Sequence, residues 1–272
     1  MNKFYIISFI NGIFYKLILR SIIFFISLLP VSLLIFSESG FKALLFPLLI
    51  IWIPFSIVIL TGIVLKAHPT IKNAEIESGS MAYFVWLNKN LIHEIVSSSS
   101  FLNNFTNRID FLKIFYYRLC GFQNPLLVIM APNVKFLDPY LLTLGKKVFI
   151  GYGTIISGHI IQGRKLCVDF VNIGNNVRIG ASCFISCGVE IQDNTMIGFG
   201  VKIGSNCKIG KNVIISSETV LDDGVIIEDN VIVGKFSIIG KKSKICSKSV
   251  LPFNSIVPPR SRIERLKIKM AV

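Results

Sequence analysis

A six-residue period of large aliphatic side chains is the feature that most constrains what this chain can fold into. From Ile173 to Val257 an Ile, Leu or Val recurs at every sixth position without a gap. The residue four positions after each of them is small or β-branched in most hexads, and the residue three positions after it is often Asn or Gly. Asn and Gly tolerate the positive φ of a tight corner. Each hexad is therefore predicted to form one short strand and one corner.

Three such hexads close a triangular coil, and stacked coils bury a continuous aliphatic column. The period thus predicts an all-β left-handed parallel β-helix, which we place at residues 131–259. Leu144, Ile150 and Ile156 supply further hexads upstream, but Ile156 and Ile173 are 17 positions apart, which is not a multiple of six. Residues 157–172 are therefore expected to leave the coil as an extruded loop. That loop contains His159, the only histidine of the predicted repeat domain.

The N-terminal part of the chain is dominated by apolar runs. Residues 43–65 are 23 positions without a charge, and residues 21–36 are a shorter uncharged run. A helix of about 20 apolar residues spans the roughly 30 Å core of a bilayer. We therefore predict a hairpin of two transmembrane helices over residues 1–65; the alternative is a buried helical hairpin. Basic residues flank the pair, so the positive-inside rule predicts a multi-pass inner-membrane protein whose remaining domains face the cytoplasm.

Residues 66–130 are expected to form a helical connector between the hairpin and the repeat. Apolar residues recur at helical spacing over 81–95 and 108–119, and Gly121 follows as a C-cap. Residues 260–272 are a basic C-terminal tail. The predicted fold is therefore a β-helix preceded by an α-helical connector and two transmembrane helices.

Composition narrows the classes of partner. The chain is 52% hydrophobic, yet its formal net charge is +14. A basic excess of this size suits nucleic acid, an anionic membrane surface or a phosphorylated cofactor, and no nucleic-acid module is present. We therefore expect the bilayer and a phosphorylated cofactor as partners, and no nucleic acid. The six cysteines contain no CxxC pair and are interpreted as reduced, core-filling thiols.

Two segments resemble a known enzyme family. LDPYLLTLGKKVFIG, which contains Asp138 and Tyr140, resembles the D-x-Y-x-x-T-I-G-D-x-V-x-I segment of hexapeptide-repeat acyltransferases, and VNIGNNVRIG resembles their V-x-I-G-N-N-V-W-I-G segment. The likeness is to the galactoside and maltose acetyltransferase branch and to envelope-polysaccharide acetyltransferases, over roughly residues 108–259. Arg178 stands where that family usually has tryptophan. The resemblance implies a homotrimer whose active sites are shared between neighbouring β-helices.

The resemblance also implies a site. His159 stands where the family has its catalytic loop histidine, and an imidazole suits a general base near neutral pH. Because the chain has no GxSxG elbow, direct attack of the acceptor on the acyl donor is favoured over an acyl-enzyme. Asp169 is predicted to orient the imidazole, and Asp138 and Tyr140 to bind the acceptor. Four basic side chains are predicted to bind the phosphates of the donor, acetyl-CoA: Arg164, Lys165, Arg178 and Arg260. For any one of these residues, an exposed turn or a solvated charge is the alternative.

These features predict a membrane-anchored O-acetyltransferase that transfers acetyl from acetyl-CoA to a hydroxyl of an envelope or lipid-linked sugar. An N-acyltransferase of an amino sugar would use the same histidine chemistry. A non-catalytic trimeric β-helix scaffold of an envelope-synthesis complex is the third alternative, against which the out-of-phase loop with His159 argues. No metal is expected, because the three histidines of the chain are scattered along the sequence.

Overall fold

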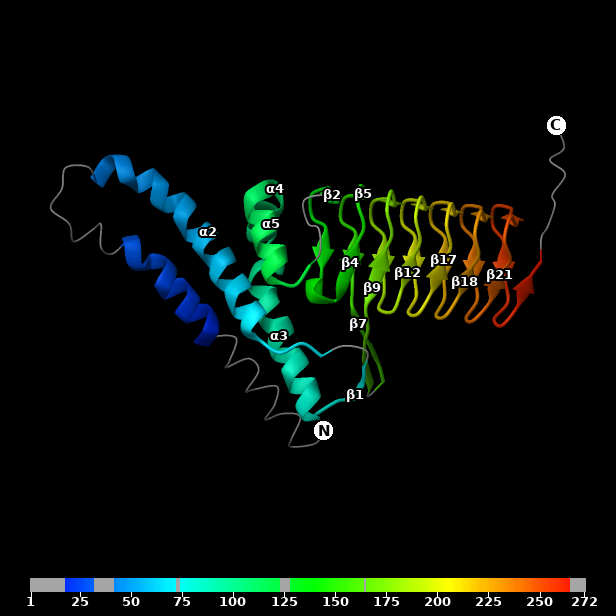
Figure 1. The fold of residues 1–272 in the computed structure, drawn as a ribbon, viewed down its shortest axis with the longest axis horizontal. Helices are drawn as coiled ribbons and strands as arrows, with labels where there is room; N and C mark the ends of the chain where they lie inside the picture. The colour runs from blue at the N-terminus through cyan, green and yellow to red at the C-terminus, as the bar shows by residue number, and fades with distance from the viewer. Residues whose placement is uncertain (1–17, 32–41, 72–73, 123–127, 164, 265–272) are drawn as a thin grey trace. The chain divides into compact units, whose positions relative to one another are not determined.

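The computed structural model describes residues 18–31, 42–71, 74–122, 128–163 and 165–264, and for residues 42–50 it describes the backbone alone. The chain divides into two compact units (Figure 1). The helical unit comprises Met1–Ile71 and Glu77–Gly121, and the solenoid unit comprises Lys72–Ile76 and Phe122–Val272.

The solenoid unit is built from three parallel sheets of seven strands each. Sheet 1 contains β2 (Val128–Met130), β5 (Val148–Ile150), β10 (Arg178–Ile179), β13 (Met196–Ile197), β16 (Ile214–Ile215), β19 (Ile232–Val233) and β22 (Val250–Leu251). Sheet 2 contains β3 (Lys135–Phe136), β6 (Ile155–Ile156), β11 (Phe184–Ile185), β14 (Lys202–Ile203), β17 (Val220–Leu221), β20 (Ile238–Ile239) and β23 (Ile256–Val257). Sheet 3 contains β4 (Leu142–Leu144), β9 (Val171–Ile173), β12 (Glu190–Ile191), β15 (Lys208–Ile209), β18 (Ile226–Ile227), β21 (Lys244–Ile245) and β24 (Arg262–Ile263).

The register of these sheets follows the six-residue period. Ile179 pairs with Ile197, three hexads further along the chain, and both side chains are buried in the solenoid. Asn176 and Asn194 occupy equivalent corners with φ of 58° and 59°, a conformation in which Asn carries little strain. The expected stack of strands and corners is therefore confirmed as a parallel β-solenoid.

A β-hairpin leaves the solenoid between β6 and β9, where the hexads change phase. β7 (His159–Gln162) and β8 (Lys165–Val168) pair antiparallel. A third strand, β1 (Ala74–Glu77), pairs with β8 from the other side. Ile76, Leu166 and Val168 are buried, so this small sheet has an apolar inner face. The sequence predicted the extrusion but neither its hairpin form nor the strand contributed from residues before the solenoid.

The helical unit contains a helix over residues 18–31, α2 (Lys42–Ala67), α3 (Met81–Ser97), α4 (Ser100–Arg108) and α5 (Asp110–Leu119). Ser80 caps α3 by accepting from the backbone N–H of Tyr83 (3.2 Å), and Ser99 caps α4 by accepting from that of Leu102 (3.3 Å). A serine at the N-cap satisfies a backbone donor that has no partner within the helix. The polar Ser97–Ser100 stretch therefore divides the predicted connector into separate helices.

The predicted membrane hairpin is contradicted. Within the part of the chain that the structure describes, no helix is long and apolar enough to cross a bilayer. Residues 1–17 and 32–41 of the predicted hairpin lie outside the described residues. In α2, Val58, Thr61 and Leu65 are buried, and a Cβ on Gly62 would lie 2.9 Å from Leu119 of α5. Apolar side chains of this helix thus pack within protein, and the multi-pass inner-membrane location is contradicted with the two spans.

Candidate active site

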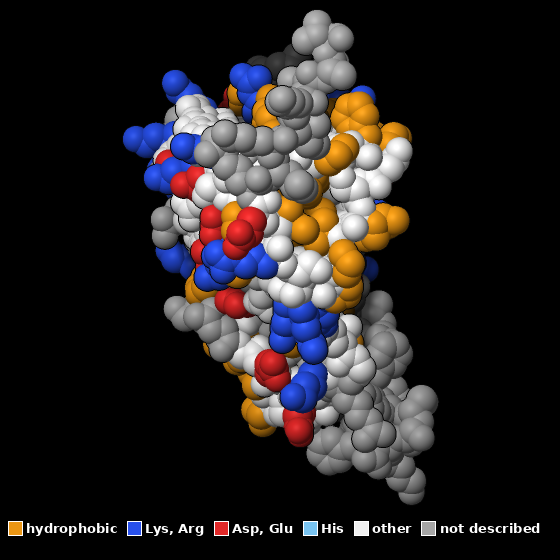
Figure 2. Space-filling model, turned by 90° about the vertical axis from the view of Figure 1, so that its right-hand side faces the viewer, with side chains coloured by type: hydrophobic (Ala, Val, Ile, Leu, Met, Phe, Trp, Pro, Cys, Tyr) orange, Lys and Arg blue, Asp and Glu red, His pale blue; other side chains and the backbone are white. Residues whose placement is uncertain are grey.

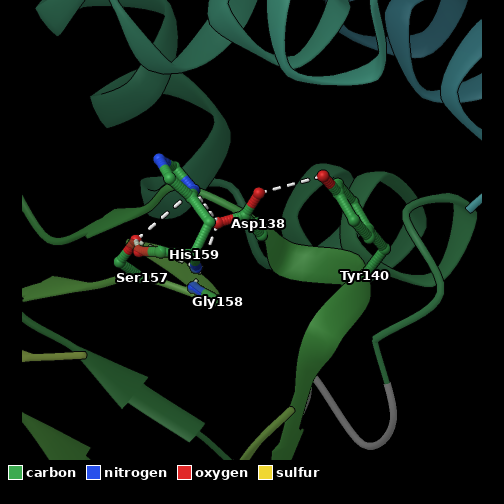
Figure 3. Close-up of polar contacts among 5 residues, drawn as sticks. All are labelled: Asp138, Tyr140, Ser157, Gly158 and His159. Carbon is green, nitrogen blue, oxygen red and sulfur yellow. Dashed lines mark hydrogen bonds and ion pairs between the residues drawn. The ribbon is translucent and has the colours of Figure 1, made fainter. Parts of the chain in front are cut away.

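The candidate site lies where the hairpin leaves the solenoid (Figure 3). His159 is the first residue of β7, and Asp138 precedes the 3₁₀ turn η2 (Pro139–Leu141). The imidazole Nδ1 of His159 is 2.5 Å from Oδ2 of Asp138. The Asp138 side chain is fully buried and that of His159 is 16% exposed. The structure therefore pairs a histidine that reaches solvent with a carboxylate that does not.

Among the described residues, Tyr140, Gly158 and His159 donate to the buried carboxylate of Asp138. Its Oδ1 accepts a hydrogen bond from the Tyr140 hydroxyl (2.9 Å), and its Oδ2 accepts from the backbone N–H of Gly158 (3.0 Å) as well as from the His159 imidazole. A buried carboxylate is stable as an anion only when such donors satisfy its lone pairs. The surrounding chain is thus arranged to hold Asp138 as an acceptor.

The backbone on either side of His159 is also held by hydrogen bonds. The Ser157 hydroxyl donates to the carbonyl of His159 (2.7 Å) and accepts from its N–H (3.3 Å), and Ser157 is buried. Because Asp138 is an acceptor, the proton shared with it belongs to Nδ1 of His159. The opposite nitrogen, Nε2, then carries a lone pair. This is the tautomer that a general base requires.

Asp169, predicted from the sequence to orient the imidazole, follows β8 at the base of the hairpin. Its Oδ1 accepts from the backbone N–H of Phe170 (2.7 Å), and its own N–H donates to the carbonyl of Gly158 (2.9 Å). Asp169 therefore closes the base of the hairpin through its backbone. The carboxylate hydrogen-bonded to the histidine is that of Asp138, for which acceptor binding was predicted together with Tyr140.

The predicted phosphate-binding residues lie on different parts of the solenoid unit. Lys165, on β8, forms an ion pair with Glu75 of β1 (3.1 Å). Arg178 faces outward on sheet 1, and Arg260 occupies the corner between sheets 2 and 3 with a φ of 59°. Arg164 lies outside the described residues. Within one chain the structure does not gather the three described cations around His159.

Two cysteines near the hairpin have thiols that are poorly suited to nucleophilic attack. Burial raises the pKa of Cys187 to about 11, against an opposing hydrogen bond with Ser186. Burial, followed by the charge of Glu75, also raises the pKa of Cys167 on β8. The thiolate is the reactive form of cysteine, and it is scarce at neutral pH in both cases. Among the described residues, no cluster of three or more His, Cys, Asp or Glu side chains is placed to hold a metal ion.

Comparison with known proteins gives one family match and several solved structures. A family model described as the GMPPB C-terminal domain matches residues 181–268, about a third of the chain. No curated protein matches the sequence.

The solved structures similar to this chain include three acyltransferases. LpxA, a UDP-N-acetylglucosamine acyltransferase from Bacteroides fragilis, is 21% identical with a TM-score of 0.29, and the match covers 51% of this chain and 58% of that one. This chain therefore spans less than two thirds of LpxA. A maltose O-acetyltransferase from Clostridium difficile is 18% identical, with a TM-score of 0.31 and coverage of 58% and 82%. A point mutant of AntD, an N-acyltransferase from Bacillus cereus in complex with dTDP and coenzyme A, is 19% identical, with a TM-score of 0.20 and coverage of 50% and 76%.

Proposed function

We propose that the chain is an acyltransferase that moves an acetyl group from acetyl-CoA to a hydroxyl of a sugar, with His159 as the general base. The observation that carries this proposal is the bond between Nδ1 of His159 and the buried carboxylate of Asp138. A lone loop histidine needs no such partner, whereas a base benefits from a group that fixes its tautomer and orientation. A lipid-linked acceptor was expected from the membrane hairpin and is not proposed, because that hairpin is contradicted.

In this mechanism Asp138 keeps the Nδ1 proton in place while Nε2 of His159 accepts the proton of the acceptor hydroxyl. The hydroxyl oxygen attacks the thioester carbon, and the imidazolium that forms is stabilised by the buried carboxylate. When the carbon–sulfur bond breaks, His159 returns the proton to the departing sulfur. The acceptor gains the acetyl group, coenzyme A leaves as its thiol, and the histidine is neutral again. Tyr140 and Gly158 act through Asp138, so they are positioning residues.

We also propose that the chain forms the homotrimer that its sequence resemblance implies. Three outward side chains on sheet 1 and three at the corner that follows it form what we call the apolar stripe: Ile214, Ile232, Val250, Phe199, Phe236 and Phe253. Each is 38–69% exposed. Figure 2 shows hydrophobic side chains gathered along one side of the visible face and charged ones along the other. Ile214, Ile232 and Val250 are register neighbours, and exposed apolar side chains gathered on one surface are typical of an interface that burial between copies would satisfy.

The proposed function is tested by the release of coenzyme A from acetyl-CoA in the presence of a panel of sugars. His159→Ala is expected to lower the rate by about 10²–10⁴-fold, the usual contribution of a general base. His68→Gln is the matched control, because the ring of His68 bonds to the carbonyl of Pro69 and belongs to the helical unit. Unchanged turnover in His159→Ala would overturn the assignment of the base. Product analysis separates O-transfer from N-transfer, and a wild-type protein without transfer or acetyl-CoA binding would favour the scaffold.

A further inference from the structure

A hollow of about 460 Å³ lies among the helices of the helical unit. Four helices contribute to its apolar wall: Ile23 and Phe24 come from the helix of residues 18–31, Ile57 from α2, Ile95 from α3 and Leu102 from α4. Ile23 and Ile95 are buried, whereas Phe24 is 49% exposed. An apolar hollow of this volume is typical of a site for a small molecule.

The polar side chains that line the hollow form one cluster. They are Arg20, Ser21, Ser98 and Ser99. The guanidinium Nη2 of Arg20 approaches the hydroxyl of Ser98 to 3.5 Å, although the two residues are 78 positions apart in the chain. Arg20 also precedes Ile23 and Phe24 by three and four positions, so all three lie on one face of their helix. The hollow therefore joins a cationic, hydroxyl-bearing part to an apolar wall.

Arg20 is half-buried, and no acidic residue lines the hollow. Among the described residues, the contact with Ser98 is the one hydrogen bond of its guanidinium, which has five N–H donors. By contrast, Lys113 in the same unit is paired with Asp110 (2.8 Å). The hydroxyl of Ser99 accepts from a backbone N–H in the first turn of α4 (3.3 Å), which leaves its own proton for a ligand. The hollow thus offers donors to an anion and contains no carboxylate that would repel it.

We propose that this hollow binds an amphiphilic molecule that carries an anionic head group on an aliphatic chain. Arg20 and Ser99 donate hydrogen bonds to the head group, and the chain lies against the apolar wall, where its removal from water favours binding. The planar guanidinium fork matches two oxygens of a carboxylate or a phosphate at once. The head group is therefore that of a fatty acid or of a phosphate-bearing lipid. The site does not depend on the proposed acyl transfer, because all its residues belong to the helical unit.

Isothermal titration calorimetry on the full chain tests the site, with octanoate, octyl phosphate, 1-octanol and acetate as separate probes. The two anionic amphiphiles are expected to bind more tightly than 1-octanol, which lacks the charge, and than acetate, which lacks the chain. Arg20→Gln is expected to weaken both anionic amphiphiles by about tenfold, which corresponds to loss of one charge-assisted hydrogen bond, and to leave 1-octanol unchanged. Arg108→Gln is the matched control, because Arg108 is exposed in the last turn of α4 and does not line the hollow.

A second pair of variants tests the apolar wall. Phe24→Ala is expected to weaken octanoate and 1-octanol alike, by about fivefold. Phe101→Ala is its control, because Phe101 is 66% exposed on α4 and does not line the hollow. Tighter binding of octanoate than of octyl phosphate assigns the hollow to a fatty acid, and the reverse order assigns it to a phosphate-bearing lipid. The inference is overturned if the wild type binds neither anionic amphiphile or binds 1-octanol as tightly, or if the variants at Arg20 and Phe24 bind like their controls.

Discussion

Gly158 lies so close to Leu141 that a Cβ at this position would come within 2.7 Å of Leu141 Cδ1 and 3.0 Å of the Cβ of Asp138. The close approach brings the N–H of Gly158 to the carboxylate of Asp138 (3.0 Å) and sets the start of the hairpin. Only a residue without a side chain fits there. The glycine before His159 is therefore part of the site.

Gly158→Ala is expected to destabilise the protein by about 1–3 kcal/mol, the usual range for overpacking. It is also expected to lower the rate of acyl transfer, because Asp138 must move. Gly163→Asn is the control: Gly163 has a φ of 63° at the hairpin turn and no atom near its missing Cβ, and Asn tolerates this conformation. Urea denaturation and the transfer assay measure both effects. Equal stability and rate in the two variants would contradict this account of Gly158.

Glu228 links neighbouring coils and makes the solenoid sensitive to acid. Its carboxylate lies 2.6 Å from Nζ of Lys244 and accepts from the N–H and the hydroxyl of Ser247, each at 2.9 Å. The bond with Lys244, followed by those with Ser247, lowers the pKa of Glu228 from 4.5 to about 2. A carboxyl whose pKa is lower in the folded state stabilises the fold above its unfolded pKa. That contribution is present above pH 4.5 and is lost between about pH 4.5 and pH 2.

Glu228→Gln is therefore expected to flatten the decline of stability over this pH window and to lower stability at neutral pH. Chemical denaturation at a series of pH values measures the difference between the two proteins. If the variant loses stability as steeply as the wild type between pH 4.5 and pH 2, the bond network of Glu228 does not contribute as described.

The apolar stripe predicts the oligomeric state. Ile232→Lys places a charge in the middle of the stripe, where burial between copies would leave that charge without a partner. Light scattering after size-exclusion chromatography is expected to give a trimer for the wild type and a smaller species for this variant. Ile226→Lys is the matched control, because Ile226 is 39% exposed and Ile232 is 41% exposed. Ile226 lies on sheet 3, outside the apolar stripe, so this variant is expected to stay trimeric. If the Ile232→Lys variant forms an oligomer of the same mass as the Ile226→Lys variant, the proposed interface is contradicted.

The repeat could be predicted because it depends on local pattern. Ile173 and Ile191 are three hexads apart and occupy the same position of the hexad, so both face inward. Ile156 and Ile173 are out of phase with each other, so the residues between them must leave the coil. The prediction of two membrane-spanning helices was wrong because a run of apolar residues has the same appearance whether lipid or protein covers it. In α2, Val58 and Leu65 are buried in the helical unit.

The partners within the site could not be predicted in the same way. His159 was identified from its place in the loop, but Asp138 lies 21 positions earlier and Asp169 only 10 positions later. The solenoid stacks β6 on β3 and β9 on β4 in successive turns, so the corner between β3 and β4 that holds Asp138 lies beside the start of β7. The DPY sequence carried a usable signal in Tyr140, whose hydroxyl bonds to Asp138.

The central claim is that Asp138 acts through His159, and a double-mutant cycle on the rate of acyl transfer tests it most directly. Asp138→Asn removes the charge that stabilises the imidazolium, and His159→Ala removes the base itself. If the two residues act as one unit, the double variant is expected to be no slower than His159→Ala alone, because effects within a unit are not additive. Asp138→Asn alone should lower kcat more than Asp169→Asn. Losses that multiply in the double variant, or an Asp138→Asn variant with wild-type kcat, would contradict the account.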